Sequence, residues 1–117
     1  MTPLIPAAES LTVEFKSDLQ ELPDRELMEA VVGLANTQGG VIYLGVEDDG
    51  RATGLHPDHR NVDSLAAFNA NRTSPPVSAR VELLEQDGLT VAVIEVPRTP
   101  RLTATTDGVL RRRRLKQ

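Results

Sequence analysis

Apolar residues recur along this chain with two spacings, one of two residues and one of three to four. Thr12–Lys16 alternates polar and apolar side chains, which predicts a short strand. Asp24 is the expected N-cap of a following helix, because its carboxylate can accept from free backbone amides. Gly39-Gly40 is expected to end that helix. Residues 25–36 show the helical spacing, and one face is expected to pack inward through Leu27, Val31, Leu34 and Ala35.

A nearly continuous apolar stretch comes next. Val41–Glu47 has the length and composition of a strand that is covered on both faces. Asp48-Asp49-Gly50 is typical of a tight turn, after which Arg51–Leu55 is expected to return as the hairpin partner. His56–Arg60 is interpreted as a polar loop. Asn61–Arg72 carries apolar residues at helical spacing and predicts a second helix.

The last third of the chain is predicted to form a series of strands. Val77–Glu85 and Leu89–Val96 alternate on either side of an Asp-Gly turn, which predicts a hairpin. Arg101–Thr105 and Val109–Leu115 are expected to form a final pair of strands. The order of elements predicts an α+β fold with a mixed, mainly antiparallel sheet and two helices, in a single domain spanning residues 1–117.

Cysteine is absent from the 117 residues, which excludes a disulfide scaffold, a thiol nucleophile and a thiolate zinc site. No apolar run approaches the roughly 20 residues that span a bilayer. Residues 1–8 lack the basic start and the apolar core of a signal peptide. We therefore expect a cytoplasmic protein that has no membrane partner.

The net charge of −4 conceals an uneven distribution of charge. Residues 97–117 hold seven basic side chains against one acid, whereas residues 1–96 hold six basic and sixteen acidic ones. Guanidinium groups bind phosphates through paired hydrogen bonds, so the basic end is predicted to bind nucleic acid, either DNA or RNA. The alternative is a solvated edge strand whose charges prevent aggregation. The basic side chains are Arg98, Arg101, Arg111, Arg112, Arg113, Arg114 and Lys116.

Three carboxylates are candidates for a metal site. Glu9 and Glu14 flank the first predicted strand, and Asp48 follows the central one. If these strands are neighbours, the three side chains converge at one edge of the sheet. Oxygen ligands of this kind suit Mg²⁺ or Mn²⁺, ions that activate water and bind phosphate in nucleases. The alternative is structural: Glu14 pairs with Lys16 or an arginine, and Asp48 shapes a turn.

Other motifs carry less chemistry. The glycines between residues 39 and 50 follow a helix and precede a strand, which is the reverse of a phosphate-binding loop. His56 and His59 are three residues apart and form a candidate metal-binding loop, but Pro57 favours a solvated turn. The sequence contains no nucleophile-elbow motif, so a catalytic serine triad is unsupported.

A set of short motifs runs through the chain at Glu9-Ser10, Val13–Lys16, Leu34–Gly40, Tyr43–Gly50 and Gly54. Together they resemble the Schlafen AlbA-2 domain family. The family pattern is a Glu…Glu-Phe-Lys strand, a helix ending in Ala-Asn-Thr-x-Gly-Gly, and a strand of the form Ile-Gly-Val-x-Asp-x-Gly. The resemblance covers nearly the whole chain. Within it, Asn36-Thr37 is expected to satisfy backbone amides at the end of the helix.

The resemblance implies an α+β nucleic-acid-binding domain, usually the N-terminal part of longer bacterial transcriptional regulators or helicase-like proteins. In animal Schlafen proteins, related domains cleave transfer or ribosomal RNA through two glutamates and an aspartate, and these positions match Glu9, Glu14 and Asp48. The same acids recur in family members regarded as binders only. In the last strand this chain departs from the family, because Val109-Leu110 and four arginines replace an aromatic residue and Arg-x-Gly.

Three classes of function stay open at this point. We expect a binding module, the DNA-binding domain of a bacterial transcriptional regulator. The alternative is a Mg²⁺- or Mn²⁺-dependent nuclease that acts on RNA or single-stranded DNA. A protein–protein interaction through the sheet edge is the third class, and a homodimer is left open.

Overall fold

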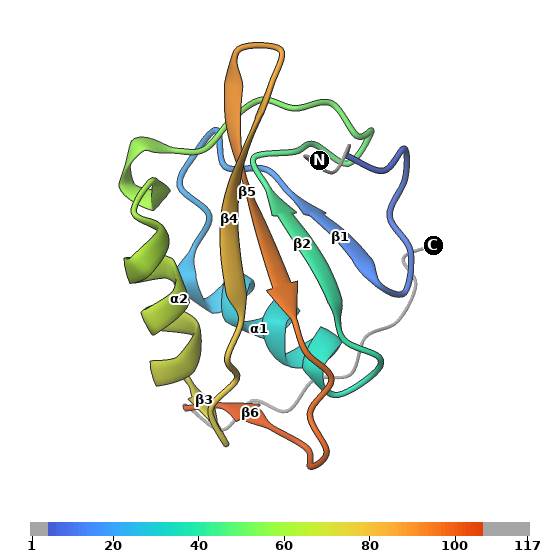
Figure 1. Cartoon of the computed structure of the whole chain (residues 1–117), viewed down its shortest axis with the longest axis vertical. Coiled ribbons are helices and arrows are strands. Elements are labelled where there is room, and N and C mark those ends of the chain that lie inside the picture. The colour runs from blue at the N-terminus through green and yellow to red at the C-terminus, as the bar shows by residue number, and fades with distance from the viewer. Residues whose placement is uncertain (1–4, 107–117) are drawn as a thin grey trace.

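The structure, a computed structural model, describes residues 5–106. Its main feature is a four-stranded sheet in the order β1-β2-β5-β4 (Figure 1). β1 (Val13–Lys16) runs parallel to β2 (Gly40–Leu44). β2 is antiparallel to β5 (Leu89–Val96), which in turn is antiparallel to β4 (Arg80–Gln86). The predicted α+β fold with a mixed, mainly antiparallel sheet is confirmed.

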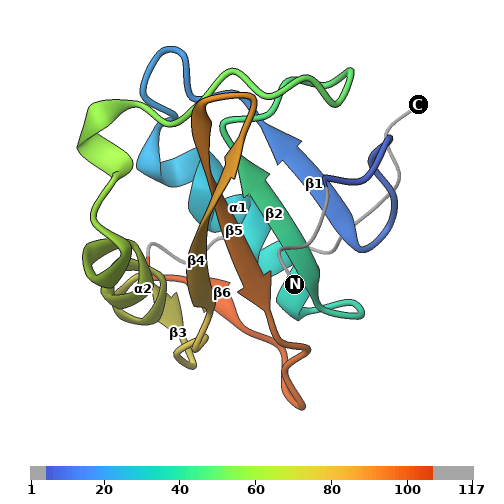
Figure 2. The same ribbon diagram turned by 45° about the horizontal axis from the view of Figure 1, so that its top comes forward.

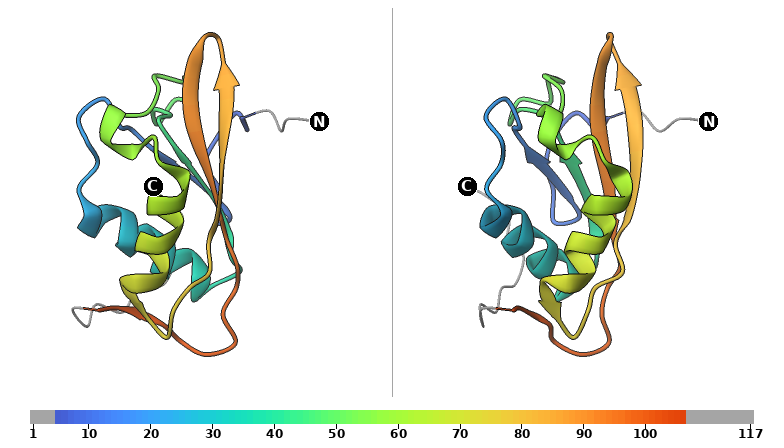
Figure 3. Two further views of the ribbon diagram at one scale, coloured as in Figure 1. Left: turned by 60° about the vertical axis from the view of Figure 1, so that its left-hand side comes forward. Right: turned by 90° about the vertical axis from the view of Figure 1, so that its left-hand side faces the viewer.

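Both helices lie against the same face of the sheet, as the side views show (Figure 3). α1 (Asp24–Ala35) and α2 (Val62–Asn71) cover the larger of two hydrophobic cores, to which β2 contributes Ile42 and Leu44. No helix among the described residues is long and apolar enough to cross a bilayer. The inward face predicted for the first helix is confirmed, because all four of its residues are buried, namely Leu27, Val31, Leu34 and Ala35.

The opposite face of the sheet carries a smaller core. The ring of Phe15 on β1 meets that of Tyr43 on β2 edge-on, with 6.0 Å between centroids and 74° between planes. β2 is therefore covered on both faces, as its apolar composition predicted. It ends at Leu44, earlier than predicted, because Gly45 turns the backbone with a φ of 101°. The small core consists of Phe15, Tyr43, Val46, Leu84, Val91 and Val93.

A second, two-stranded sheet lies at the end of the molecule where α2 ends (Figure 2). It pairs β3 (Thr73–Ser74) with β6 (Ala104–Thr105) in antiparallel fashion. The sequence predicted a strand over Arg101–Thr105, but it did not predict β3 as a partner. Val109–Leu115, the partner that it did predict, lies outside the described residues.

Three local predictions were wrong. Asp24 is the first residue of α1 and not its N-cap, because Pro23 occupies the cap position and makes no side-chain hydrogen bond there. Residues 51–55 do not form a strand: the two sides of the turn share one isolated bridge, between Val46 and Ala52. Backbone hydrogen bonds from Thr53 and Gly54 to the carbonyl of Gly45 also join them, but they do not continue as a ladder. The polar loop predicted for residues 56–60 instead contains a short 3-10 helix over Pro57–His59, in which His59 is buried while Pro57 and Asp58 are exposed.

Candidate functional site

The first candidate site is the stretch Pro97–Thr106, called the basic segment below, which leaves β5 and contains β6. Its two arginines, Arg98 and Arg101, are exposed. Thr99 lies between them, and both its backbone N–H and its hydroxyl donate to the carbonyl of Ala35 at the end of α1, at 2.9 and 3.0 Å. The backbone that carries Arg98 is thereby fixed to the helix.

Asn36 holds the basic segment at a second point. Its side-chain oxygen accepts from the backbone N–H of Thr103, and its side-chain nitrogen donates to the carbonyl of the same residue, both at 2.8 Å. The Thr103 hydroxyl also donates to the carbonyl of Pro75 at 2.6 Å. Arg101 therefore lies between two anchored residues, Thr99 and Thr103. The two guanidinium groups are presented to solvent from a backbone that is held in place.

The Ala-Asn-Thr-Gln-Gly-Gly motif explains this attachment. A Cβ on Gly39 would lie 2.7 Å from the carbonyl oxygen of Val96 and 2.8 Å from the backbone nitrogen of Arg98, so a side chain there would push the basic segment away. Thr37 donates its hydroxyl to the carbonyl of Gly33 within α1. Asn36 was expected to satisfy amides at the helix end, whereas the amide that it satisfies belongs to Thr103.

The second candidate site is the set of three carboxylates. Glu14 on β1 is only 3% exposed, and its register partner on β2 is Ile42, which belongs to the larger core. Neighbours across a ladder point to the same face of a sheet, so Glu14 faces the side that the helices cover. A bridge between Ser10 and Val13 folds the chain back before β1. Glu9, one residue before the bridge, consequently comes to lie across from Glu14.

Asp48 is less closely associated with the two glutamates. It is exposed in the turn after β2. A Cβ on Gly50 would lie 3.1 Å from the carbonyl oxygen of Ala7, so this turn packs against the segment that leads to Glu9. However, the group of ligand-type side chains that gathers in the described part of the chain does not contain Glu9, Glu14 or Asp48.

Asp48 also lines an open groove of about 650 Å³ between its turn and the loop that follows β1. The charged residues around this groove are three acids, Glu21, Glu26 and Asp48, and one base, Lys16. A groove with this balance repels phosphates unless a cation is present. The groove and the basic segment thus differ in the kind of ligand that they attract.

The structure contains one buried pair that the sequence did not predict. Asp18 is fully buried, and its carboxylate accepts from the backbone N–H groups of Leu22 and His56, each at 2.8 Å. It also contacts Nδ1 of His59 through both of its oxygens, at 2.8 and 3.0 Å. The spacing of the two histidines pointed to this loop, but nothing in the sequence near Asp18 connects it with His59.

The remaining predicted phosphate-binding side chains lie outside the described residues. They are Arg111, Arg112, Arg113, Arg114 and Lys116. The structural account of the basic end of the chain therefore rests on Arg98 and Arg101.

Comparison with known protein families gives one match. A family model described as "Schlafen, AlbA_2" matches residues 9–117. No curated protein matches the chain.

Two solved structures are similar to this one. The DIP2311 protein from Corynebacterium diphtheriae superimposes with a TM-score of 0.74 and 25% sequence identity over 89% of this chain. The match spans only 21% of that protein. The second is the N-terminal domain of a protein from Nitrosomonas europaea described as related to the ATP-dependent DNA helicase RecG. It has a TM-score of 0.69 and 24% identity, and the match covers 93% of this chain and 81% of that one.

Proposed function

The chain belongs to the Schlafen AlbA-2 family, and from this premise we propose that it is a nucleic-acid-binding domain that contacts phosphates through its basic segment. The observation that carries the proposal is the pair of exposed arginines, Arg98 and Arg101, on a backbone fixed to α1 through Ala35 and Asn36. The proposal also includes Arg111–Arg114 and Lys116 as phosphate-binding side chains, on the basis of the sequence alone.

A fixed backbone favours this function for an energetic reason. Binding a polyanion costs conformational entropy when the contacting segment must be ordered first. Here the hydrogen bonds to Ala35 and Asn36 order the segment before the ligand arrives, and two guanidinium groups remain free to form paired contacts with phosphates. Each phosphate that is neutralised also releases counterions, which is favourable at low salt.

We further propose that the nucleic acid is DNA, and that the chain acts in the cytoplasm as the N-terminal, DNA-binding part of a longer bacterial transcriptional regulator. The Nitrosomonas europaea protein with the same fold is described as related to a DNA helicase, which supports DNA over RNA. The limited share of DIP2311 that the chain matches supports a longer protein.

A second candidate function is a metal-dependent nuclease. It is favoured by the fold-back at Ser10, which places Glu9 across from Glu14 on β1. In this proposal Glu9, Glu14 and Asp48 hold Mg²⁺ or Mn²⁺ and the substrate is RNA or single-stranded DNA. We favour binding without efficient cleavage, because Asp48 is exposed and the groove that it lines is acidic.

One experiment separates the two functions. The purified chain is incubated with labelled transfer RNA, single-stranded DNA and duplex DNA, with and without Mn²⁺, and both binding and cleavage are followed. We expect binding, tightest to duplex DNA, and intact products. Cleavage that disappears in Glu14→Gln but persists in Glu85→Gln, an exposed control on β4 with the same charge change, would establish the nuclease. A failure to bind any of the three nucleic acids would refute the binding proposal.

A further inference from the structure

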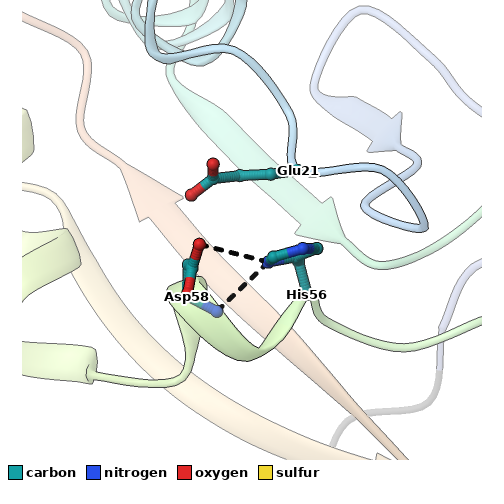
Figure 4. A group of neighbouring side chains, drawn as sticks. All are labelled: Glu21, His56 and Asp58. Carbon is teal, nitrogen blue, oxygen red and sulfur yellow. Dashed lines mark hydrogen bonds and ion pairs between the residues drawn. The ribbon is translucent and has the colours of Figure 1, made fainter.

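The loop between β1 and α1 and the 3-10 helix lie at the opposite end of the molecule from β6 (Figure 1). They carry a different cluster of ligand-type side chains. Glu21 comes from the loop between β1 and α1, while His56 and Asp58 come from the start of the 3-10 helix (Figure 4). One ligand atom from each of these three residues lies within 4.8 Å of the other two. Figure 4 shows the Glu21 carboxylate reaching over Asp58, with the His56 ring beside them.

Within this cluster Nδ1 of His56 accepts from the backbone N–H of Asp58 at 3.2 Å (Figure 4), and the separations between side chains are longer. Nδ1 of His56 lies 3.7 Å from a carboxylate oxygen of Asp58, and Nε2 of His59 lies 3.7 Å from a carboxylate oxygen of Glu21. Both distances exceed the range of a good N–H···O bond. Nitrogen and oxygen ligands of a tetrahedral zinc ion stand about 2.0–2.2 Å from the metal, which places them roughly 3.4 Å from one another. The exposed side chains of Glu21 and Asp58 need only a small movement to reach that separation.

His59 supplies an independent indication. Its side chain is 8% exposed, and Nδ1 contacts both oxygens of Asp18. Asp18 already accepts from two backbone amides, so it acts as an acceptor and Nδ1 of His59 carries the hydrogen. The other ring nitrogen, Nε2, lies 3.7 Å from a carboxylate oxygen of Glu21, so a buried ring nitrogen borders the cluster. Either a proton or a metal ion can join this nitrogen to this oxygen.

We propose that Glu21, His56, Asp58 and His59 form a binding site for a divalent transition-metal ion of the zinc type. Two imidazole nitrogens and two carboxylate oxygens are ligands that Zn²⁺ accepts, whereas Mg²⁺ prefers oxygen ligands alone. Two carboxylates balance the charge of the ion. The ligand atoms of Glu21, His56 and Asp58 already lie within 4.8 Å of one another, and in this proposal Nε2 of His59, which lies 3.7 Å from Glu21, joins them when the ion binds. This site is separate from the basic segment and from Glu9, Glu14 and Asp48, so it goes beyond the proposed function.

Asp18 prepares the site for the ion. A histidine that binds a metal usually donates its other ring N–H to a carboxylate, which fixes the tautomer and the orientation of the ring. Asp18 does this for His59, and its bonds to the amides of Leu22 and His56 tie together the two loops that carry the ligands. The backbone of the site is therefore held in place without the ion, and only exposed side chains must adjust.

The test is calorimetric titration of the full chain, prepared without a polyhistidine tag and stripped of metal with a chelator. We expect one equivalent of Zn²⁺ to bind and Mg²⁺ at the same concentration to give no signal. His56→Ala, Glu21→Gln and Asp58→Asn should each weaken the affinity for Zn²⁺ by at least about tenfold. Asp58 is 66% exposed, so Asp58→Asn should leave the fold intact, as the metal-free melting temperature will show.

Two further variants make the result decisive. Glu85→Gln also removes an exposed carboxylate, but on β4 and outside the cluster. Glu14→Gln removes one of the three carboxylates that match the family positions. Both should bind Zn²⁺ as the unaltered chain does. The inference is overturned if the chain takes up no Zn²⁺, which would mean that a proton alone lies between His59 and Glu21. It is also overturned if Zn²⁺ binding is lost in Glu14→Gln and retained in Asp58→Asn.

Discussion

Two adjacent glycines control the passage from the first helix to the sheet. Gly39 has a φ of 73° and Gly40 a φ of 154°, both within the region that favours glycine over other residues. A Cβ on Gly40 would meet the backbone of Thr12, with its Cα at 2.9 Å. At this point the chain needs both an unusual backbone conformation and the absence of a side chain.

Replacement of Gly40 by valine should therefore destabilise the domain. We expect Gly40→Val to lower the free energy of unfolding by about 1–3 kcal/mol, from backbone strain and from the clash with Thr12. Thermal denaturation measures the change. Gly88→Val is the matched control, because Gly88 also has a positive φ, of 78°, but has no atom within 4 Å of an added Cβ. Equal effects in the two variants would show that the close approach to Thr12 contributes nothing.

The free energy of unfolding is expected to fall at alkaline pH because of Tyr43. Burial raises the pKa of its phenol above the ordinary value of 10.0, and the carboxylate of Glu95 raises it further. The folded state keeps this proton after the unfolded state has lost it. The stabilisation is thus complete below the unfolded pKa of about 10 and is lost as the pH rises through the higher folded pKa. Urea denaturation between about pH 9 and pH 11 should show a smaller loss of stability in Tyr43→Phe. Identical pH profiles for the two proteins would contradict this assignment.

The buried pair of Asp18 and His59 shows which residues sequence patterns miss. The two residues are 41 positions apart, and the intervening chain includes α1 and β2. A polar residue in a loop carries no periodicity, so its burial depends on which loops the fold brings together. Glu9 and Glu14 were singled out because they flank the first predicted strand, and His59 because it lies three residues from His56. Neither pattern connects His59 with Asp18.

At the scale of elements, long periodic segments were predicted well and short ones were not. α1, α2 and the hairpin of β4 and β5 each repeat their apolar spacing over seven or more residues, which is enough to establish a period. β3 and β6 have two residues each, and two residues cannot show a period. Their pairing instead follows from the two points at which the basic segment is held. Thr99 donates its backbone N–H to the carbonyl of Ala35, and Thr106 donates its backbone N–H to the carbonyl of Arg72.

The attachment of the basic segment to α1 can be tested without any change of charge. Asn36→Ala removes two hydrogen bonds to Thr103 and should lower the free energy of unfolding by about 1–3 kcal/mol. It should also weaken nucleic-acid binding, because Arg101 is then carried on a less ordered backbone. Asn61→Ala is the matched control, since Asn61 caps α2 by accepting from Ser64 and its loss costs about 1 kcal/mol. Nucleic-acid binding that weakens equally in both variants would show that the attachment is not specific to function.

At the scale of the whole molecule, charge is divided between two regions. Residues 1–96 are acidic in balance, and the stretch from residue 97 onward is strongly basic. An acidic body repels phosphates and basic side chains attract them, so in the proposed function the field of the protein orients a polyanion toward Arg98 and Arg101. The sequence predicted this division directly, because it depends on counts of charged residues. The anchoring of the arginines required the structure, since it depends on contacts between residues about 65 positions apart.

The most direct measurement of the central claim is the salt dependence of binding to duplex DNA. The logarithm of the affinity falls with the logarithm of the salt concentration by about 0.9 for each phosphate contacted. The double variant Arg98→Gln/Arg101→Gln should bind more weakly and should reduce this slope by about 1.8. Arg80→Gln is the control, because Arg80 is an exposed arginine on β4 that pairs with Glu82 at 3.0 Å. The salt dependence measured for this variant should have the same slope as that of the unaltered chain. An unchanged slope and affinity in the double variant would contradict the claim that the basic segment binds phosphates.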